Sequence, residues 1–467
     1  MVLQRDVLCP IWGRCEASAR VRVQLMGEMH ETRADRDGHW RISLPPRPAG
    51  GPCEIVIESG DARRVIRHVM VGEVWVCSGQ SNMGWPVQSC VDAGVTIRDA
   101  DRPGLHLLQI PQVVSDEPLW NAESQWARCT PSAVRDFSAV AYFFGRRLHS
   151  RLDVPIGLID TSWGGTTAQA WTPPEVLRRR FPSIIEGWED ERAAYPDALK
   201  RYEERFSEWQ RTRDRARESG DPVPPAPPAP RTPSDPHPGG LYNAMLAPLI
   251  PWSIRGAIWY QGESNAGQAE LYRRLFPAMI DGWRDKWGRD FPFYFVQLPN
   301  YDPPDGSLPE HVWARIREAQ SAALDLPRTG MAVTIDVGDT HDLHPPDKLP
   351  VGERLARLAL HDSYGEEISA RSPMLDSVRL ESEEVRVHFT NVDGGLVIHG
   401  DTAQGFELLS EGGDTIPVTA RAEGESVILG IRGDREPAEL RYAWANAPDA
   451  NLYSTAGLPA APFRTKL

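Results

Sequence analysis

Short apolar runs alternate with segments of helical periodicity between residues 71 and 364. The runs lie at residues 74–77, 156–159, 257–260, 293–296 and 331–335, with a further candidate at 105–110. Continuous apolar runs of this length are typical of strands covered on both faces of a sheet. Between them, apolar residues recur at helical spacing across 137–148, 271–287 and 351–358. This alternation predicts an α/β fold with a mostly parallel sheet and right-handed crossovers.

The two ends of the chain follow a different pattern. Residues 1–70 contain stretches in which apolar and polar positions alternate, for example at 21–25 and 40–44. Residues 365–467 contain short apolar runs separated by Gly, Asp and Asn. Both patterns predict β-sandwich-like modules. We therefore expect three domains, at residues 1–70, 71–364 and 365–467.

An insertion at residues 175–238 interrupts the alternation in the middle domain. Its first part is charged and carries an apolar stripe at helical spacing, which includes Trp188 and Trp209. A proline-rich stretch at 222–230 follows, and proline fits neither a helix interior nor a central strand. We expect a helix followed by an extended polyproline segment that acts as a stiff connector.

Composition and charge restrict the classes of partner. The 467-residue chain has a formal net charge of −14, which argues against a nucleic-acid or anionic-membrane partner. No apolar run is long enough to span a bilayer.

The start shows no export signal, so we expect a cytoplasmic protein as the chain begins here, and a secreted or periplasmic one if further residues precede it. The six cysteines include no Cys-x-x-Cys pair, so neither a structural zinc site nor a disulfide framework is predicted.

Candidate chemistry follows the predicted strands. Gly79 and Ser81 come directly after the first run, where a glycine permits a sharp turn and open α/β sheets place their ligands. Gly164 and Gly165 follow the second run and leave backbone N–H groups accessible to a ligand. Because the carboxyl ends of parallel strands share one edge, these loops are expected to converge.

Two further polar motifs follow later strands. In the first, Gln261 and Asn265 are candidate donors to an oxyanion, and Glu263 is a candidate to hold the loop in place. In the second, His344 is a candidate general base, and Asp342 lies two residues before it as a candidate orienting carboxylate. A metal site made by His341, Asp342 and His344 is the alternative, but the chain offers no clear further ligand.

The motifs together carry a family resemblance. The chain reads Gly-Gln-Ser-Asn-Met at 79–83, Ser-Trp-Gly-Gly at 162–165, Trp-Tyr-Gln-Gly-Glu-Ser-Asn at 259–265 and Asp-Leu-His-Pro at 342–345. In these motifs, and in flanking stretches near both ends, it resembles the sialate O-acetylesterase family of the SGNH hydrolases. The resemblance implies a three-layer α/β/α hydrolase domain with a mostly parallel sheet, flanked by N- and C-terminal β-sandwich-like modules.

The resemblance also implies a serine esterase that removes O-acetyl groups from a sugar. Because the chain offers no convincing set of metal ligands, we expect neither a metal nor a cofactor. Ser81 is then the nucleophile and His344 the base, oriented by Asp342 or by a backbone carbonyl. The oxyanion hole is then formed by the N–H of Ser81, an N–H of Gly164 or Gly165, and the side chain of Gln261 or Asn265. Side chains beside the motifs are candidates for sugar binding, namely Gln80, Trp163, Trp259 and Glu263.

The expected partner is an O-acetylated sugar, with a sialate as the first candidate. An esterase of acetylxylan or another polysaccharide is the near alternative on the same machinery. A carbohydrate-binding protein that has lost catalysis is the alternative from another class. The sequence does not determine the oligomeric state.

Overall fold

Strand β7 (Ala62–Gly79) passes without interruption from the N-terminal module into the central domain. Its first half pairs antiparallel with β6 (Gly50–Ser59). Its second half lies between β10 (Ile156–Ser162) and β11 (Gly256–Tyr260), and both pairings are parallel. The expected domain boundary at residue 70 therefore falls inside one continuous strand. The computed structural model describes residues 1–230, 232–233, 236–381, 383–432 and 436–467.

The central sheet has the strand order β13-β12-β11-β7-β10-β8-β9. Its remaining strands are β8 (Arg102–Gln109), β9 (Ala127–Cys129), β12 (Phe293–Val296) and β13 (Thr329–Ala332). All pairings are parallel except that of β9 with β8. The apolar runs form these strands because helices cover both faces, so no polar residue is needed on either side.

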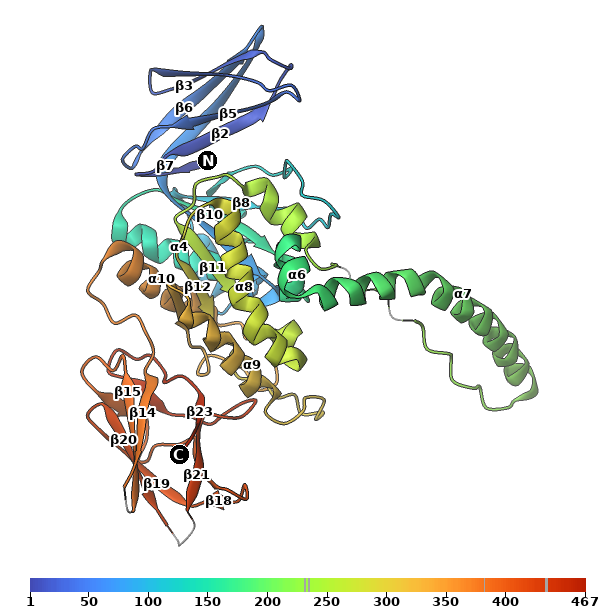
Figure 1. Ribbon diagram of the computed structural model, residues 1–467, viewed down its shortest axis with the longest axis vertical. Helices are drawn as coiled ribbons and strands as arrows, with labels where there is room; N and C mark the ends of the chain where they lie inside the picture. Colours follow the sequence, from blue (N-terminus) through green and yellow to red (C-terminus); the bar gives the residue numbers. More distant parts are fainter. Residues whose placement is uncertain (231, 234–235, 382, 433–435) are drawn as a thin grey trace.

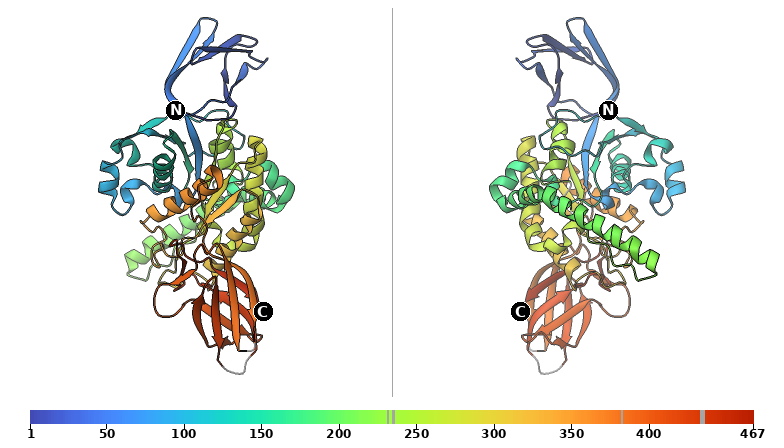
Figure 2. Two further views of the ribbon diagram at one scale, coloured as in Figure 1. Left: turned by 90° about the vertical axis from the view of Figure 1, so that its left-hand side faces the viewer. Right: turned by 90° about the vertical axis from the view of Figure 1, so that its right-hand side faces the viewer.

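Helices cover the central sheet on both faces (Figures 1 and 2). Helices α4 (Ala139–Leu152) and α10 (Leu349–Tyr364) pack against each other, and α8 (Ala269–Trp287) packs with α9 (Val312–Ser321). Trp75 of β7 contacts Phe144 of α4, whereas Trp259 of β11 contacts Phe276 of α8. The predicted three-layer α/β/α architecture is thus confirmed.

Two β modules lie at opposite ends of the central domain (Figure 2). The N-terminal module contains β1 (Val2–Gln4), β2 (Cys9–Arg14), β3 (Arg20–Leu25), β4 (Glu28–Arg33) and β5 (His39–Leu44) together with β6 and the start of β7. In the C-terminal module, one sheet contains β14 (Met374–Leu380), β15 (Glu384–Thr390), β19 (Val418–Glu423) and β20 (Ser426–Ile431). Its second sheet contains β17 (Phe406–Ser410), β18 (Thr415–Ile416), β21 (Pro437–Tyr442) and β23 (Phe463–Lys466). Strands β16 (Leu396–Ile398) and β22 (Leu452–Ser454) form a small pair beside them.

Arg317 of α9 ties the C-terminal module to the central domain. Its buried guanidinium donates hydrogen bonds to the carbonyls of Leu298 and Pro299 at 2.8 and 2.7 Å. It also donates to the carbonyls of Ala445 and Asn446, both at 2.8 Å, which lie just after β21. No carboxylate pairs with this buried guanidinium in the described structure. The hydrogen bonds to the four carbonyls therefore compensate for the burial of its charge.

The insertion projects away from the central domain (Figure 1). It begins with α6 (Pro174–Arg180) and α7 (Pro182–Ser219), which agree with the predicted helical pattern. The proline-rich stretch that follows has neither helix nor strand, and the indole N–H of Trp209 donates to the carbonyl of Pro224 at 2.8 Å.

Among the described helices, none combines the length and apolar character needed to cross a bilayer.

Candidate active site

Ser81 stands where the central strand ends. It is the first residue of the short helix α1 (Ser81–Gly84), two residues beyond the end of β7. Gly79 has φ +142°, and a Cβ there would come within 2.1 Å of the carbonyl oxygen of Tyr260. Only glycine fits this close approach of two strands. The turn therefore presents the Ser81 side chain at the carboxyl edge of the sheet, as the sequence predicts.

His344 reaches Ser81 from the loop that precedes α10. Its Nε2 lies 2.8 Å from Oγ of Ser81. The ring stacks on Trp85, with 5.2 Å between ring centroids and an interplanar angle of 11°. Burial lowers the pKa of His344, and the charge of Lys348 lowers it further. The imidazole is consequently neutral at neutral pH, which is the form that accepts a proton.

Asp342 contacts the backbone of His344 instead of its ring. Its Oδ1 accepts the backbone N–H of His344 at 2.8 Å. In the described part of the chain, neither a carboxylate nor a backbone carbonyl is hydrogen-bonded to the imidazole of His344. The expectation that Asp342 or a carbonyl orients the ring through a hydrogen bond is therefore not met. Aspartate readily bonds the N–H two residues ahead, and this local bond occupies Oδ1 of Asp342.

His341 is exposed and takes part only in the local loop structure. Its backbone N–H donates to Oδ1 of Asp339 at 2.8 Å. Within the described residues, no three His, Cys, Asp or Glu side chains are grouped so that they could hold a metal ion. The alternative arrangement of His341, Asp342 and His344 around one ion is thus absent from this loop.

Gly164 lies against Ser81. A Cβ at Gly164 would be 3.2 Å from Cβ of Ser81, and Gly164 lines the same pocket. Gly165 adopts φ +73°, which glycine accommodates without strain. Neither the N–H of Ser81 nor that of Gly164 is used in a hydrogen bond with any described residue. Both groups remain available to a ligand oxygen.

The amides of Gln261 and Asn265 are already occupied, which corrects the expectation that one of them donates to an oxyanion. Gln261 Nε2 donates to the carbonyl of Thr166 at 3.1 Å and to Oδ1 of Asn265 at 2.8 Å. Asn265 Nδ2 donates to Oε1 of Gln169 at 2.8 Å. Both side chains are fully buried. They join the third motif to the segment after Gly165, because buried amides must find internal partners.

The other predicted sugar contacts also lie outside the pocket. Gln80 Oε1 accepts the backbone N–H of Ser264 at 3.3 Å, so this side chain supports the neighbouring loop. Trp259 is fully buried among the aromatic rings of α8 and β12, where no sugar reaches it. Trp163 donates its backbone N–H to the carbonyl of Gly79 at 3.0 Å and is not a pocket-lining residue.

Glu263 belongs to a buried charged network behind the Ser81–His344 pair. Asn82 Nδ2 donates to Oε1 of Glu263 at 2.6 Å and to the carbonyl of Leu343 at 3.0 Å. Lys348 Nζ donates to Oδ1 of Asn82 at 2.5 Å. Burial raises the pKa of Glu263 and lowers that of Lys348 to about 8. The network holds the loop of His344 against the residue that follows Ser81. Glu263 thus acts on the His344 loop, whereas the sequence predicts that it holds its own loop after β11, and it does not line the pocket.

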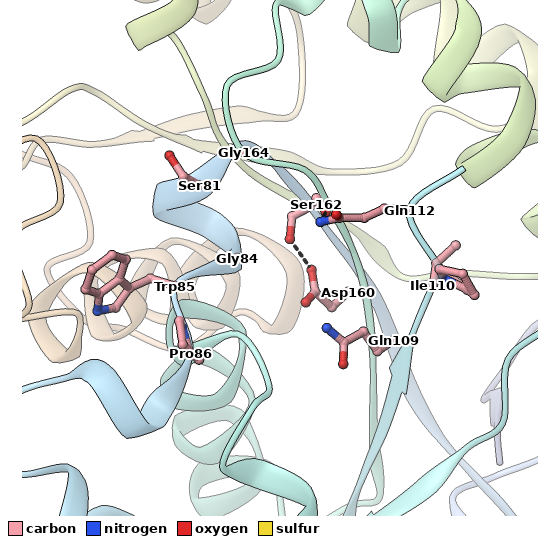
Figure 3. A pocket seen from close by; sticks show the side chains of 11 residues that line it. Ser81, Gly84, Trp85, Pro86, Gln109, Ile110, Gln112, Asp160, Ser162 and Gly164 are labelled. Atoms are coloured by element: carbon pink, nitrogen blue, oxygen red, sulfur yellow. Dashed lines mark hydrogen bonds between the residues drawn. The ribbon is translucent and has the colours of Figure 1, made fainter. Parts of the chain in front are cut away.

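A pocket of about 670 Å³ opens beside Ser81 (Figure 3). The residues that line it are Ser81, Gly84, Trp85, Pro86, Gln109, Ile110, Pro111, Gln112, Asp160, Ser162 and Gly164. Ser81 and Trp85 lie on one side, and Asp160, Ser162 and Gln112 lie on the other. Sequence reasoning assigned no role to Trp85, Gln109, Gln112, Asp160 or Ser162. The signals were present, since Trp85 follows Ser81 by one helical turn and Asp160 is an acidic residue within a buried strand.

Comparisons with known proteins find relatives among the carbohydrate esterases. Residues 237–361 match the family model described as carbohydrate esterase, sialic acid-specific acetylesterase. A solved carbohydrate acetylesterase from Xanthomonas citri is 33% identical, covers 99% of this chain and 96% of its own, and has a TM-score of 0.82.

Proteins named sialate O-acetylesterase resemble the chain along its whole length. The one from Rattus norvegicus is 28% identical over 100% of this chain and 93% of its own length. The one from Homo sapiens is 28% identical over 99% of this chain and 90% of its own length. Together with the Xanthomonas citri enzyme and the α/β/α fold, these likenesses establish that the chain is a carbohydrate O-acetylesterase of the sialate O-acetylesterase family.

Proposed function

We propose that the chain hydrolyses O-acetyl esters of a sugar with Ser81 as nucleophile and His344 as general base. The observation that carries this proposal is the 2.8 Å contact between Ser81 Oγ and His344 Nε2 at the edge of an open pocket. Serine is a weak nucleophile until a neighbouring base takes its proton. The lowered pKa of His344 supports this role, because the neutral ring persists at neutral pH.

The reaction proceeds in two half-reactions. Ser81 Oγ attacks the acetyl carbonyl carbon while His344 Nε2 takes the hydroxyl proton. The resulting imidazolium returns this proton to the sugar oxygen as the C–O bond breaks, which leaves acetyl on Ser81. A water molecule then attacks the acetyl-serine with His344 again as base. Acetate leaves and Ser81 regains its proton.

Backbone donors are suited to stabilise the oxyanion of each tetrahedral intermediate. The N–H groups of Ser81 and Gly164 are unused within the described residues, and the missing side chain at Gly164 leaves room beside Ser81. Preorganised donors at such a position commonly contribute about 10²–10³ in kcat each. With Gln261 and Asn265 engaged elsewhere, these two N–H groups are the donors we assign.

Trp85 and the Asn82 network position the base. The Trp85 ring covers one face of the imidazole, and Asn82 holds the carbonyl of Leu343, the residue next to His344. Asp342 secures the same loop through the His344 N–H. We therefore propose a Ser81–His344 dyad whose orientation depends on packing and on the loop backbone.

Two classes of sugar are candidates for the substrate. The names of the Rattus norvegicus and Homo sapiens relatives support an O-acetylated sialate. An uncharged acetylated polysaccharide such as acetylxylan is the second candidate. The pocket lining favours this second candidate. It includes the acidic Asp160, and none of its eleven described residues is a lysine or an arginine.

Release of acetate tests the proposal. The full chain is assayed on 4-nitrophenyl acetate and on acetylated sugars of both classes, beside the variants Ser81→Ala and His344→Ala. We expect activity on sugar esters and a loss of about 10⁶ in kcat for Ser81→Ala, as is typical when the nucleophile of a serine hydrolase is removed. A correctly folded Ser81→Ala that retains more than a few percent of the wild-type kcat would contradict the proposal. An inactive wild-type chain that still binds acetylated sugars would identify a carbohydrate-binding protein instead.

A further inference from the structure

Asp160 presents a buried carboxylate to the pocket. It lies on β10, only 3% of its surface is exposed, and it is one of the pocket-lining residues. Its Oδ1 accepts the hydroxyl of Ser162 at 2.7 Å, and no other hydrogen bond to this carboxylate is present in the described structure. A buried carboxylate needs several donors to offset its lost hydration. Asp160 therefore has accepting capacity that a ligand is placed to use.

The surrounding residues keep this carboxylate next to the bound substrate. A Cβ at position 84 would come within 2.7 Å of Ser162 Oγ. Because Gly84 has no Cβ, Ser162 fits between α1 and Asp160. The Asp160 carbonyl accepts the N–H of Ile110 at 2.9 Å, which fixes the backbone independently of the side chain. Figure 3 shows Asp160 and Ser162 across the pocket from Trp85.

No cation neutralises Asp160 within the described residues. Its register partners on the neighbouring strands are Gln109 of β8 and Cys77 of β7. Burial and the charge of Asp160 raise the pKa of Cys77, so the thiol stays protonated. Gln112 donates to the carbonyl of Ser162 and carries no charge. Lys348 is not one of the pocket-lining residues, and its ammonium donates to Asn82 and lies over the Trp85 ring.

We propose that Asp160 determines the sugar class of the enzyme, by accepting a hydroxyl of an uncharged O-acetylated sugar and by repelling the carboxylate of an acidic one. The inference rests on the proposed function, because it concerns the sugar whose acetyl group Ser81 attacks. A sugar hydroxyl supplies the missing hydrogen bond, whereas a second carboxylate places like charges in one poorly hydrated pocket.

The ionisation of Asp160 gives the proposal a signature in the wild-type enzyme. Burial raises the pKa of Asp160 to about 7. Asp160 is thus mostly protonated at pH 5 and mostly charged at pH 8, whereas a sugar carboxylate is ionised throughout this range. The ratio of kcat/KM for a neutral acetylated sugar to that for an acidic one is expected to rise from pH 5 to pH 8.

Two measurements on the full chain test the inference. The substrates are an acetylated xylo-oligosaccharide and an O-acetylated sialate, with 4-nitrophenyl acetate as the ester without a sugar. In the wild type, we expect the neutral-to-acidic ratio of kcat/KM to rise about tenfold between pH 5 and pH 8. At pH 8, we expect Asp160→Asn to lower this ratio at least tenfold, chiefly through KM, because the amide removes the charge while keeping the shape. The exposed Asp101→Asn is the matched control.

The outcomes separate this inference from the proposed function. A wild type that cleaves all three esters with a pH-independent ratio overturns the role of Asp160 and leaves the esterase mechanism intact. An unchanged ratio in folded Asp160→Asn does the same. A wild type that cleaves none of the esters overturns the proposed function and the inference with it. If Asp160→Asn fails to fold, the wild-type pH series decides alone.

Discussion

Asp342 Oδ1 accepts the backbone N–H of His344 at 2.8 Å, while the imidazole of His344 bonds Ser81 through Nε2. The carboxylate therefore controls where the loop passes and leaves the ring to be held by Trp85. Its charge still acts on the ring, because it raises the pKa of His344 against the lowering caused by burial and by Lys348. The backbone role and the electrostatic role of Asp342 can be tested separately.

Asp342→Asn tests whether the charge or the hydrogen bond is needed. Asparagine keeps an oxygen that accepts the His344 N–H, so we expect kcat to fall by less than about tenfold. Replacing the orienting aspartate of a serine protease, in contrast, lowers kcat by roughly 10⁴. Loss of the charge lowers the pKa of His344, which moves the acid limb of the kcat/KM profile to lower pH. The measurement is a pH series on 4-nitrophenyl acetate. A kcat loss near 10⁴ would show that Asp342 bonds the ring during catalysis.

Lys348→Met is expected to move the same profile in the opposite direction. Lys348 lowers the pKa of His344, so removing its charge stabilises the imidazolium and raises that pKa. The base is then neutral only at higher pH, and the acid limb shifts upward. Lys286→Met, at an exposed lysine paired with Glu175, serves as the control. An acid limb that stays in place in folded Lys348→Met would disprove the electrostatic coupling.

Gly164→Ala tests the space beside the nucleophile. The added Cβ would lie 3.2 Å from Cβ of Ser81, close to where the acetyl group must approach. We expect kcat on 4-nitrophenyl acetate to fall at least about tenfold, since misplacing reacting groups by a fraction of an ångström to an ångström is costly. Thermal unfolding should barely change. Gly187→Ala, in open space on α7, is the matched control, and equal activity of the two variants would argue against Gly164 at the oxyanion.

Arg317→Met is expected to destabilise the protein without altering the chemistry. The methionine removes the guanidinium donors to four carbonyls. The carbonyls of Leu298 and Ala445 then have no donor among the described residues, whereas those of Pro299 and Asn446 keep the indole N–H of Trp313 and the backbone N–H of Tyr301. A loss of about 3 kcal/mol or more is typical for such a change. Urea unfolding followed by tryptophan fluorescence measures the loss, with the exposed Arg63→Met as reference. If both variants unfold at the same urea concentration, Arg317 does not tie the module to the domain.

The sequence was sufficient for the architecture around Ser81. Apolar runs at 74–77, 156–159 and 257–260 form buried parallel strands because the pattern of burial is local and repeats along the chain. Parallel strands end at one edge, so the convergence of Ser81, Gly164 and the third motif followed from their positions alone. Gly79 could also be recognised from the sequence, because a tight turn at the end of a strand needs a residue without Cβ.

The tertiary structure decided which polar side chains face the substrate. Gln261 and Asn265 are chemically suited to an oxyanion, yet the segment after Gly165 lies close enough to take their hydrogen bonds. Asp160 and Trp85 came to line the pocket only through the packing of β8 and of the His344 loop around them. A sequence determines which residues can donate or accept and where the strands end. The choice of partner depends on distances between segments far apart in the chain, which exist only once the chain has folded.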